Sequence, residues 1–449
     1  MKQSKEHLDQ LDLAHFWHPF TQMSEYADYD QLHVDHGLGC WVWDTEGNKY
    51  LDANASIWTN VHGHNDPDLN KVLIDQINKI SHSTTLGISH EPGIRLAKKL
   101  ADISPGSLNR VFYSDNGSNA VEIALKLSFQ YWQLVGETKR TKVISMENAY
   151  HGDTFGTMGI GDSGVFHERF SNWCFPAIHF QSPKCVEVNE HVSSSSDIES
   201  LESLEKIFIK HADEIACLII EPSVQGAAGM KFQPKGFLKK IELMCAEKRV
   251  HLIVDEVFTG FGRVGEMLVV HKEEVEPDFL CLAKGLTAGY LPLAATVAKD
   301  EIFDQFLGRF SEFKTFFHGH TFTGNPLGSV VALKSIEKLE LLFNEGHLSE
   351  TIAYLGNRLS EVFEDHPNVR EIRQRGFCAS IDLCPEGVAD QEFPIEDRVG
   401  LKIAINARKH GLLLRPLANS ILIVPPIVIS KSEIDFLVEN LKIALNSTL

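Results

Sequence analysis

The sequence predicts an α/β fold: a large lobe on a mostly parallel sheet, and a smaller α+β lobe. Between residues 92 and 289, short apolar runs alternate with longer amphipathic runs, as strands and crossover helices do in a parallel sheet. Each apolar run ends in a polar or charged residue followed by a loop. In open α/β sheets ligands bind outside the carboxyl ends of the strands, so functional side chains are expected there.

Five segments are the predicted strands of the large lobe: residues 110–115, 142–147, 216–222, 251–256 and 279–284. The polar, serine-rich residues 186–200 predict an exposed excursion and not a domain boundary.

The smaller lobe is predicted from both ends of the chain. After Pro326 a long amphipathic helix is followed by shorter helices and strands, and these are grouped with the N-terminal residues. The predicted division is 1–64 for the N-terminal arm and part of the small lobe, 65–326 for the large lobe, and 327–449 for the C-terminal part of the small lobe.

Composition narrows the function to small-molecule chemistry. The 449 residues carry 61 acidic and 42 basic side chains, a formal charge of -19, and no Lys/Arg cluster. This charge disfavours nucleic acid and anionic membrane surfaces as partners. The first twenty residues lack an apolar segment and no stretch approaches a membrane span, so a cytoplasmic protein is expected. Eight cysteines without a CxxC pair predict reduced thiols, with no zinc site and no disulfide framework.

Two charged residues end neighbouring strands of the predicted sheet. Asp255 follows the apolar run LIV, and Lys284 follows FLCLA. Lys284 lies 29 positions after Asp255, which suits one crossover unit and predicts adjacent strands. Taken alone, Lys284 also fits a lysine that extends from a strand end to solvent.

Two further motifs lie at predicted strand ends. In SDNGSNAVEIALK a helix is predicted to begin at Gly117 and Ser118, where free backbone N–H groups suit an anion. The alternative is an ordinary turn with a serine cap, which would have the same sequence pattern. The apolar residues predicted to share one face of this helix are Val121, Leu125, Phe129 and Trp132. In NAYHGDT, Tyr150 is suited either to stacking on a planar ligand or to local packing.

Together these residues predict a pyridoxal 5'-phosphate site. The cofactor requires a carboxylate, a lysine, a phosphate-binding helix start and an aromatic plate at one sheet edge. Asp255 would face the pyridine nitrogen and keep it protonated. Lys284 would hold the aldehyde as a Schiff base and later transfer the substrate proton.

Five motifs resemble the signatures of the class III pyridoxal-phosphate aminotransferases, which have fold type I: SDNGSNAVEIALK, NAYHGDTFG, IVDEVFTGFGRVG, CLAKGLTAGYLP and HGHTFTGNPLG. The likeness extends from about His15 to the C-terminal strand. HFWHPFTQM, SIWTNVHGH, VFYSDNGS, LSFQYW and LLLRP are most similar to the branch that acts in biotin synthesis and converts 8-amino-7-oxononanoate to 7,8-diaminononanoate.

The resemblance implies a role for each matched residue. Gly117 and Ser118 hold the phosphate, Tyr150 stacks on the ring, Asp255 pairs with the ring nitrogen, and Lys284 carries the cofactor. Tyr150 is thus grouped with Asp255 and Lys284 as catalytic.

Other matched residues concern the partner subunit and the substrates, a small-molecule amino donor and a keto acceptor. Thr321 is similar to the threonine that reaches the phosphate of a second subunit, which implies a homodimer with shared active sites. Arg415 resembles the arginine that receives the keto acid's carboxylate, with a structural ion pair as the alternative. Asp153 and Arg263 either touch substrate or support residues that do, and Glu221 is expected to orient other side chains.

Two departures from the family's commoner pattern indicate which amino donor the protein uses. HPFT replaces HPYT and ASIW replaces SSWW, so Phe20 lacks a hydroxyl and Ile57 replaces one aromatic residue beside Trp58. Each lost contact is worth on the order of 1 kcal/mol to an adenosyl group. The departures favour lysine over S-adenosylmethionine, with neutral packing changes as the alternative.

Three other functions are alternatives to this one. Another class III ω-aminotransferase shares every cofactor residue. A non-catalytic relative would be expected to lack Lys284 or Asp255, and both are present. An NAD-dependent enzyme would show a GxGxxG at its first helix, which is not found.

Overall fold

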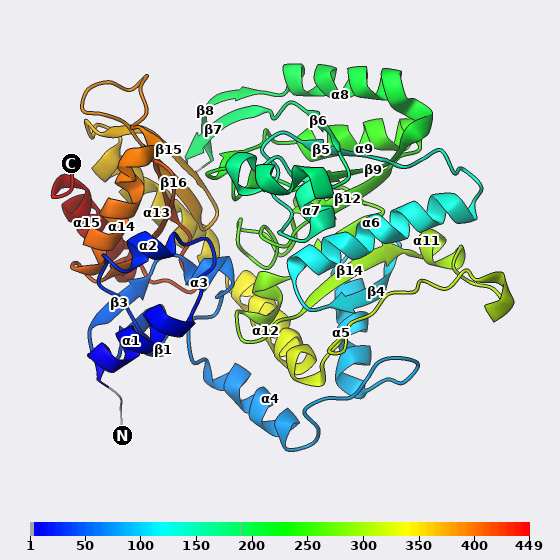
Figure 1. The fold of residues 1–449 in the computed structure, drawn as a ribbon, viewed down its shortest axis with the longest axis horizontal. Helices are drawn as coiled ribbons and strands as arrows, with labels where there is room; N and C mark the ends of the chain where they lie inside the picture. Colours follow the sequence, from blue (N-terminus) through cyan, green and yellow to red (C-terminus); the bar gives the residue numbers. More distant parts are fainter. Residues whose placement is uncertain (1–3, 189) are drawn as a thin grey trace.

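The computed structural model of the chain, which describes residues 4–188 and 190–449, has a seven-stranded sheet at the centre of its larger lobe (Figure 1). In order across the sheet the strands are β4 (Leu108–Ser114), β14 (Ala294–Lys299), β13 (Phe279–Leu282), β12 (His251–Asp255), β9 (Ile215–Ile220), β5 (Lys142–Met146) and β6 (Ile178–Phe180). β14 runs antiparallel to both of its neighbours, and the other neighbouring pairs are parallel.

All five predicted strands are present, with ends within two residues of the predicted ones. β12 and β13 are parallel neighbours, as predicted, and Asp255 pairs in register with Cys281. β6 and β14 were not predicted. β14 follows β13 after a short connection without a crossover helix, which allows the chain to return antiparallel.

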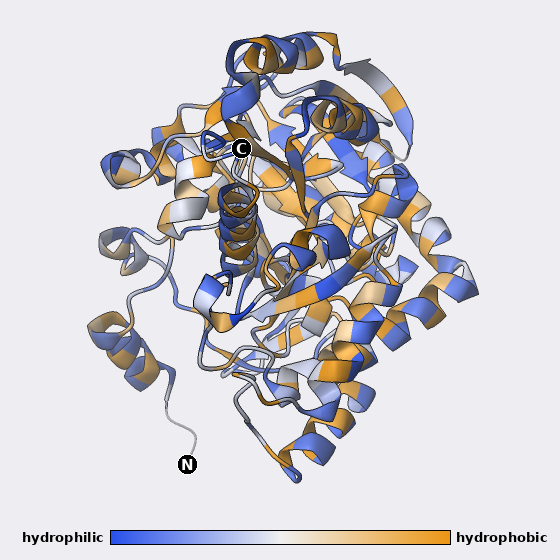
Figure 2. Ribbon diagram, turned by 90° about the vertical axis from the view of Figure 1, so that its right-hand side faces the viewer, coloured by the Kyte–Doolittle hydropathy of each residue, from blue (hydrophilic) through white to orange (hydrophobic). Residues whose placement is uncertain are grey.

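Helices cover both faces of this sheet. On one face lies α6 (Gly117–Leu134), and on the other lie α5 (Glu91–Asp102), α8 (Ile198–His211), α9 (Phe237–Lys248) and α12 (Pro326–Glu345). The strands alternate between these layers: Ile253 packs with the α6 side, whereas Leu252 and Val254 pack with the opposite side. Figure 2 shows the consequence, with mostly hydrophobic strands inside helices of mixed character.

One residue of the predicted apolar helix face is placed differently. Val121, Leu125 and Trp132 of α6 are buried, but Phe129 is 48% exposed. Helical periodicity predicts which residues share a stripe, but the width of the surface that covers the stripe decides how much of it is buried.

The smaller lobe combines the two ends of the chain, as predicted. One sheet has the order β1 (Val34–Leu38), β2 (Trp41–Asp44), β3 (Lys49–Asp52) and β17 (Leu412–Leu413). A second sheet has the order β15 (Val369–Arg375), β16 (Cys378–Leu383), β19 (Ser420–Ile423) and β18 (Arg415–Leu417). The helices are α13 (His347–Phe363), α14 (Val399–Arg408) and α15 (Lys431–Asn446), with α1 (Lys5–His15) and α2 (Met23–Tyr26) beside them (Figure 1). The division at residues 64 and 326 stays a prediction.

The predicted excursion at residues 186–200 is a β-hairpin in part. β8 (His191–Ser196) is exposed along its whole length, as expected. β7 (Lys184–Val188) differs, because Glu187 is buried and forms an ion pair with Arg375 of the smaller lobe at 2.5 Å. The polar composition predicted that this strand is exposed, but Glu187 can be buried because Arg375 compensates its charge.

Within the described ranges, no helix is long and apolar enough to cross a membrane. All eight cysteines are free.

Candidate active site

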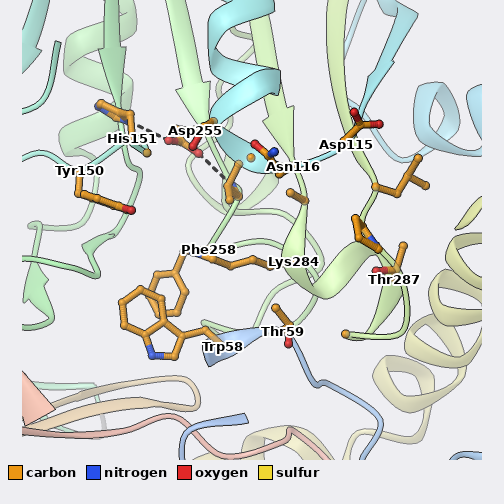
Figure 3. Close-up of a pocket in the computed structure, with 18 of the residues that line it drawn as sticks. Trp58, Thr59, Asp115, Asn116, Tyr150, His151, Asp255, Phe258, Lys284 and Thr287 are labelled. Carbon is orange, nitrogen blue, oxygen red and sulfur yellow. Dashed lines mark hydrogen bonds and ion pairs between the residues drawn. The ribbon is translucent and has the colours of Figure 1, made fainter. Parts of the chain in front are cut away.

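A cavity of about 440 Å³ opens at the carboxyl ends of the parallel strands (Figure 3). Its wall includes Ser118 from the start of α6, Tyr150 from the loop after β5, Asp255 from the end of β12 and Lys284 just after β13. Trp58, from the smaller lobe's N-terminal segment, closes one side. The cavity therefore lies where the sequence predicted it, and it brings together Gly117, Ser118, Tyr150, Asp255, Lys284 and Trp58.

Asp255 is held as an acceptor at both oxygens. Its Oδ2 lies 2.7 Å from Nδ1 of His151, and its Oδ1 accepts a hydrogen bond from the Val257 N–H at 3.0 Å. Asp255 and His151 are both buried. Both contacts hold the carboxylate in one orientation at the cavity wall, where it can pair with a protonated ring nitrogen.

His151 is a site residue that the sequence analysis missed. The motif NAYHGDT places it beside Tyr150, but its partner lies 104 positions away. The sequence near His151 gives no sign that its partner is a carboxylate at the end of another, distant strand. The only available signal was the position of both residues at the ends of parallel strands.

Lys284 points its amine into the cavity, toward two aromatic rings. Its Nζ lies 4.9 Å from the ring centre of Trp58 and 5.3 Å from that of Phe258. Burial lowers the pKa of Lys284 from its ordinary value, while the negative charges of Asp255 and Glu221 oppose the shift. No carboxylate in the described chain lies within ion-pair distance of this amine. A lysine so placed is more readily deprotonated and thus a better nucleophile and base.

The start of α6 forms an anion site with tight walls. Asn116 caps the helix by accepting a hydrogen bond from the Asn119 N–H at 3.0 Å, and its carbonyl accepts one from the Ala120 N–H at 3.1 Å. Among the described residues, the N–H groups of Gly117 and Ser118 have no such partner and stay available to an anion. A Cβ at Gly152 would come within 1.8 Å of the Ser118 Oγ, and one at Gly117 within 2.5 Å of a Val257 methyl. The absence of a Cβ at both glycines therefore lets the Ser118 hydroxyl and the backbone lie close together, and a phosphate site requires such hydroxyl and backbone donors.

Glu221 connects the Tyr150 loop to the sheet. It is buried at the end of β9 and accepts hydrogen bonds from the N–H groups of Tyr150 at 3.1 Å and Gly226 at 3.2 Å. Burial raises the pKa of Glu221 to about 7. Both donors are backbone N–H groups, so Glu221 holds the backbone of the Tyr150 loop, and the expected role of orienting other side chains stays a prediction.

Asp153 joins Tyr150 to a second residue missed from sequence, His167. The Tyr150 hydroxyl donates to Asp153 Oδ2 at 2.8 Å, and the other oxygen lies 3.0 Å from Nε2 of His167. Burial, and then this hydrogen bond to Asp153, raise the pKa of Tyr150. Asp153 does not line the cavity itself, so within one chain it acts on the wall through Tyr150.

Four other predicted residues lie outside the cavity of a single chain. Phe20, Ile57, Thr321 and Arg415 are all exposed. Phe20 packs edge-on against Phe166, with 5.8 Å between ring centres. Arg415 has no acidic partner among the described residues, so the ion-pair alternative finds no support there, and partial burial lowers its pKa.

Arg263, expected either to touch substrate or to support residues that do, lies next to the cavity wall but is not part of it in a single chain. Its side chain is 1% exposed and does not line the cavity. The guanidinium donates to the backbone oxygens of Pro425 at 2.5 Å and Asn60 at 3.3 Å. Arg263 thus connects the large lobe to both ends of the chain, while its buried Nε has no hydrogen-bond partner among the described residues.

The segment that carries Ile57 and Trp58 has an unusual backbone. Four consecutive residues have left-handed φ values: Ala55 at 43°, Ser56 at 47°, Ile57 at 65° and Trp58 at 67°. None is glycine. A left-handed helical conformation costs roughly 1–2 kcal/mol for each residue with a Cβ, so surrounding contacts must stabilise this turn.

Comparisons with known proteins identify the family of the chain. A family model described as Aminotransferase class-III matches residues 24–445. The chain is 44% identical over 439 residues to the adenosylmethionine-8-amino-7-oxononanoate aminotransferase of Geobacter sulfurreducens, covering 97% of this chain and 96% of the relative. A protein of the same name from Aquifex aeolicus is 43% identical over 440 residues, covering 98% of this chain and 97% of the relative.

Solved structures are similar as well. The crystal structure of adenosylmethionine-8-amino-7-oxononanoate aminotransferase from Methanocaldococcus jannaschii has a TM-score of 0.93 at 40% identity, with 99% of each chain covered. An (S)-enantioselective omega-transaminase from Thermomicrobium roseum has a TM-score of 0.92 at 30% identity, with 100% of each chain covered.

Proposed function

The chain belongs to the class III aminotransferases, which are pyridoxal-phosphate enzymes, and on that premise we propose that it aminates 8-amino-7-oxononanoate to 7,8-diaminononanoate in biotin synthesis. The observation that carries this substrate is the near full-length identity of 44% to a relative named for it. The motifs HFWHPFTQM and LLLRP support the same branch.

The wall of the cavity suits the cofactor. When bound, pyridoxal phosphate supplies an electron sink for the pair left at the substrate carbon. The Ser118 hydroxyl and the N–H groups of Gly117 and Ser118 hold the phosphate, and Tyr150 covers the ring. Asp255, fixed by His151 at 2.7 Å, keeps the proton on the ring nitrogen. Lys284 is the attachment point, and its amine moves the proton at the substrate carbon.

Arg415 is the proposed contact for the acceptor's carboxylate. Its guanidinium is exposed in β18, and no carboxylate of the described chain pairs with it. An arginine offers a carboxylate two parallel hydrogen bonds. Asp153 holds the Tyr150 hydroxyl at 2.8 Å and so shapes the wall that the substrate meets.

The proposed active form is a homodimer in which Thr321 serves the partner's site. Residues around Thr321 expose large apolar side chains: Leu307, Phe310, Phe313, Phe317 and Phe322. An exposed apolar patch of this kind supports a protein interface. The proposed location is the cytoplasm, which the eight free cysteines support.

Two donors remain to be separated by experiment. The relatives' names support S-adenosylmethionine, whereas Phe20 and Ile57 favour lysine. The test is a half-reaction: each donor is added to the pyridoxal form without acceptor, and conversion to the pyridoxamine form is followed by absorbance. Conversion by S-adenosylmethionine and not by lysine would refute the argument from Phe20 and Ile57.

The acceptor is tested in the second half-reaction. The pyridoxamine form should return to the pyridoxal form when 8-amino-7-oxononanoate is added, and diaminononanoate should be the product. A second candidate is a general ω-aminotransferase, because a solved structure of that name superposes with a TM-score of 0.92 at 30% identity. Turnover of simple ω-amines without turnover of 8-amino-7-oxononanoate would favour the second candidate.

A further inference from the structure

The left-handed turn at residues 55–58 is the most strained segment next to the cavity. It is closed by hydrogen bonds from the Trp58 N–H to the Asn54 carbonyl at 2.9 Å and from the Thr59 N–H to the Ala55 carbonyl at 3.0 Å. A β-branched residue such as Ile57 is especially unfavourable at positive φ. A strained conformation persists only where its surroundings impose it, and such conformations are concentrated at functional sites.

Asp52, at the end of β3, imposes this turn. Its carboxylate is buried, and Oδ1 accepts a hydrogen bond from the Ser56 N–H at 3.1 Å. Oδ2 accepts from the Ser56 hydroxyl at 2.8 Å and lies 3.0 Å from Nε2 of His64. Asp52 thus binds Ser56 at both its backbone and its side chain, in the middle of the left-handed run.

The turn determines where Trp58 stands. The indole Nε1–H donates to the Asn54 side chain at 3.1 Å, and the ring packs on Phe258 with 4.5 Å between centres. Beneath it lies Gly226, where a Cβ would come within 3.2 Å of the indole. Figure 3 shows the indole and the Phe258 ring side by side next to Lys284. The direction of the Trp58 Cα–Cβ bond is set by this backbone, so the turn and the contacts with Asn54 and Phe258 together hold the indole 4.9 Å from the Lys284 amine.

We propose that Asp52 is a positioning residue, which holds the left-handed turn and so fixes the indole of Trp58 as the wall of the amino-donor site beside Lys284. The inference rests on the proposed function, because it makes Trp58 a substrate wall. Asp52 itself does not line the cavity, so its effect reaches the donor through Ser56 and Trp58.

The test combines Asp52→Asn with two substitutions of Ser56. In Asp52→Asn one of the two acceptor oxygens becomes an NH2 donor, so the Ser56 hydroxyl and the ring of His64 can no longer both donate to that position. The donor KM should rise about tenfold, equivalent to about 1.4 kcal/mol, with kcat nearly unchanged. Adding Ser56→Gly should recover most of this loss, because glycine adopts left-handed φ without a steric penalty. Adding Ser56→Ala removes the same hydroxyl, keeps the Cβ and should recover nothing.

Two measurements decide the outcome. The first is donor KM and kcat in the half-reaction, using whichever of L-lysine and S-adenosylmethionine converts the cofactor. The second is the melting temperature of the cofactor-free variants, which should be higher for the Gly double variant than for the Ala one. A KM rise and a melting temperature that are the same in both double variants would overturn the proposal, as would a loss confined to kcat. Failure of 8-amino-7-oxononanoate as acceptor would instead overturn the proposed function and leave this test intact.

Discussion

Gly152→Ala is expected to weaken pyridoxal phosphate binding by about 10- to 150-fold in a protein that still folds. A Cβ at this position would come within 1.8 Å of the Ser118 Oγ and 2.6 Å of its Cβ, so the serine must move. Its hydroxyl then leaves the anion site. A hydrogen bond to a charged group is worth about 1.5–3 kcal/mol, which gives the expected loss in affinity.

The control for this variant is Gly136→Ala. Both glycines have positive φ, 128° at Gly152 and 85° at Gly136, so both variants incur a backbone cost of about 1–3 kcal/mol in stability. Nothing lies within 4 Å of a Cβ at Gly136. Gly136→Ala should therefore lower the melting temperature of the cofactor-free protein and leave cofactor affinity unchanged.

The assay is a titration of cofactor-free enzyme with pyridoxal phosphate, followed by its absorbance. Ser118→Ala should reproduce the loss in affinity, and the double variant with Gly152→Ala should lose little more, because both changes remove the same contact. If Gly152→Ala binds cofactor as tightly as Gly136→Ala, the steric argument and the phosphate role of Ser118 are both wrong.

Four further predictions concern the same site. In Lys284→Ala, borohydride treatment should leave no label, whereas in the wild type peptide mapping should find the pyridoxyl group on Lys284; a label on another lysine would contradict the assignment. Asp255→Asn should lose most turnover, on the order of 10²–10³-fold, while the melting temperature changes little; near-normal turnover would contradict its role. Burial raises the pKa of Glu256 to about 7, above its value of 4.5 in an unfolded chain. The folded state thus binds this proton more tightly than the unfolded chain does. The protonated carboxyl adds its whole contribution to the stability of the fold below pH 4.5, and this contribution is lost as the pH rises through 7. The melting temperature should consequently fall less from pH 5 to pH 8 in Glu256→Gln than in the wild type, and an equal fall would refute the shift. Heterodimers of Lys284→Ala and Thr321→Ala subunits should regain one intact site, and no recovery in verified heterodimers would show that the sites are self-contained.

The sequence by itself determined five of the seven strands of the central sheet and the two charged strand ends. Short apolar runs that alternate with amphipathic runs predict buried strands and the helices that connect them, because this pattern depends only on neighbouring residues of the chain. Parallel strands place their carboxyl ends at one edge, so Asp255 and Lys284 could be predicted as neighbours from their spacing alone. The helix start at Gly117 was predictable for the same reason, because it follows such a strand directly.

Only the tertiary structure decided which side chains meet across that edge. His151 contacts Asp255 from 104 positions away, and Arg263 is buried against backbone carbonyls, so neither local pattern nor spacing could assign them. The left-handed turn before Trp58 was equally hidden, since no glycine marks it and the buried carboxylate of Asp52 holds it. Strain of this kind opposes local propensity, and it persists only because contacts from the folded chain outweigh that propensity.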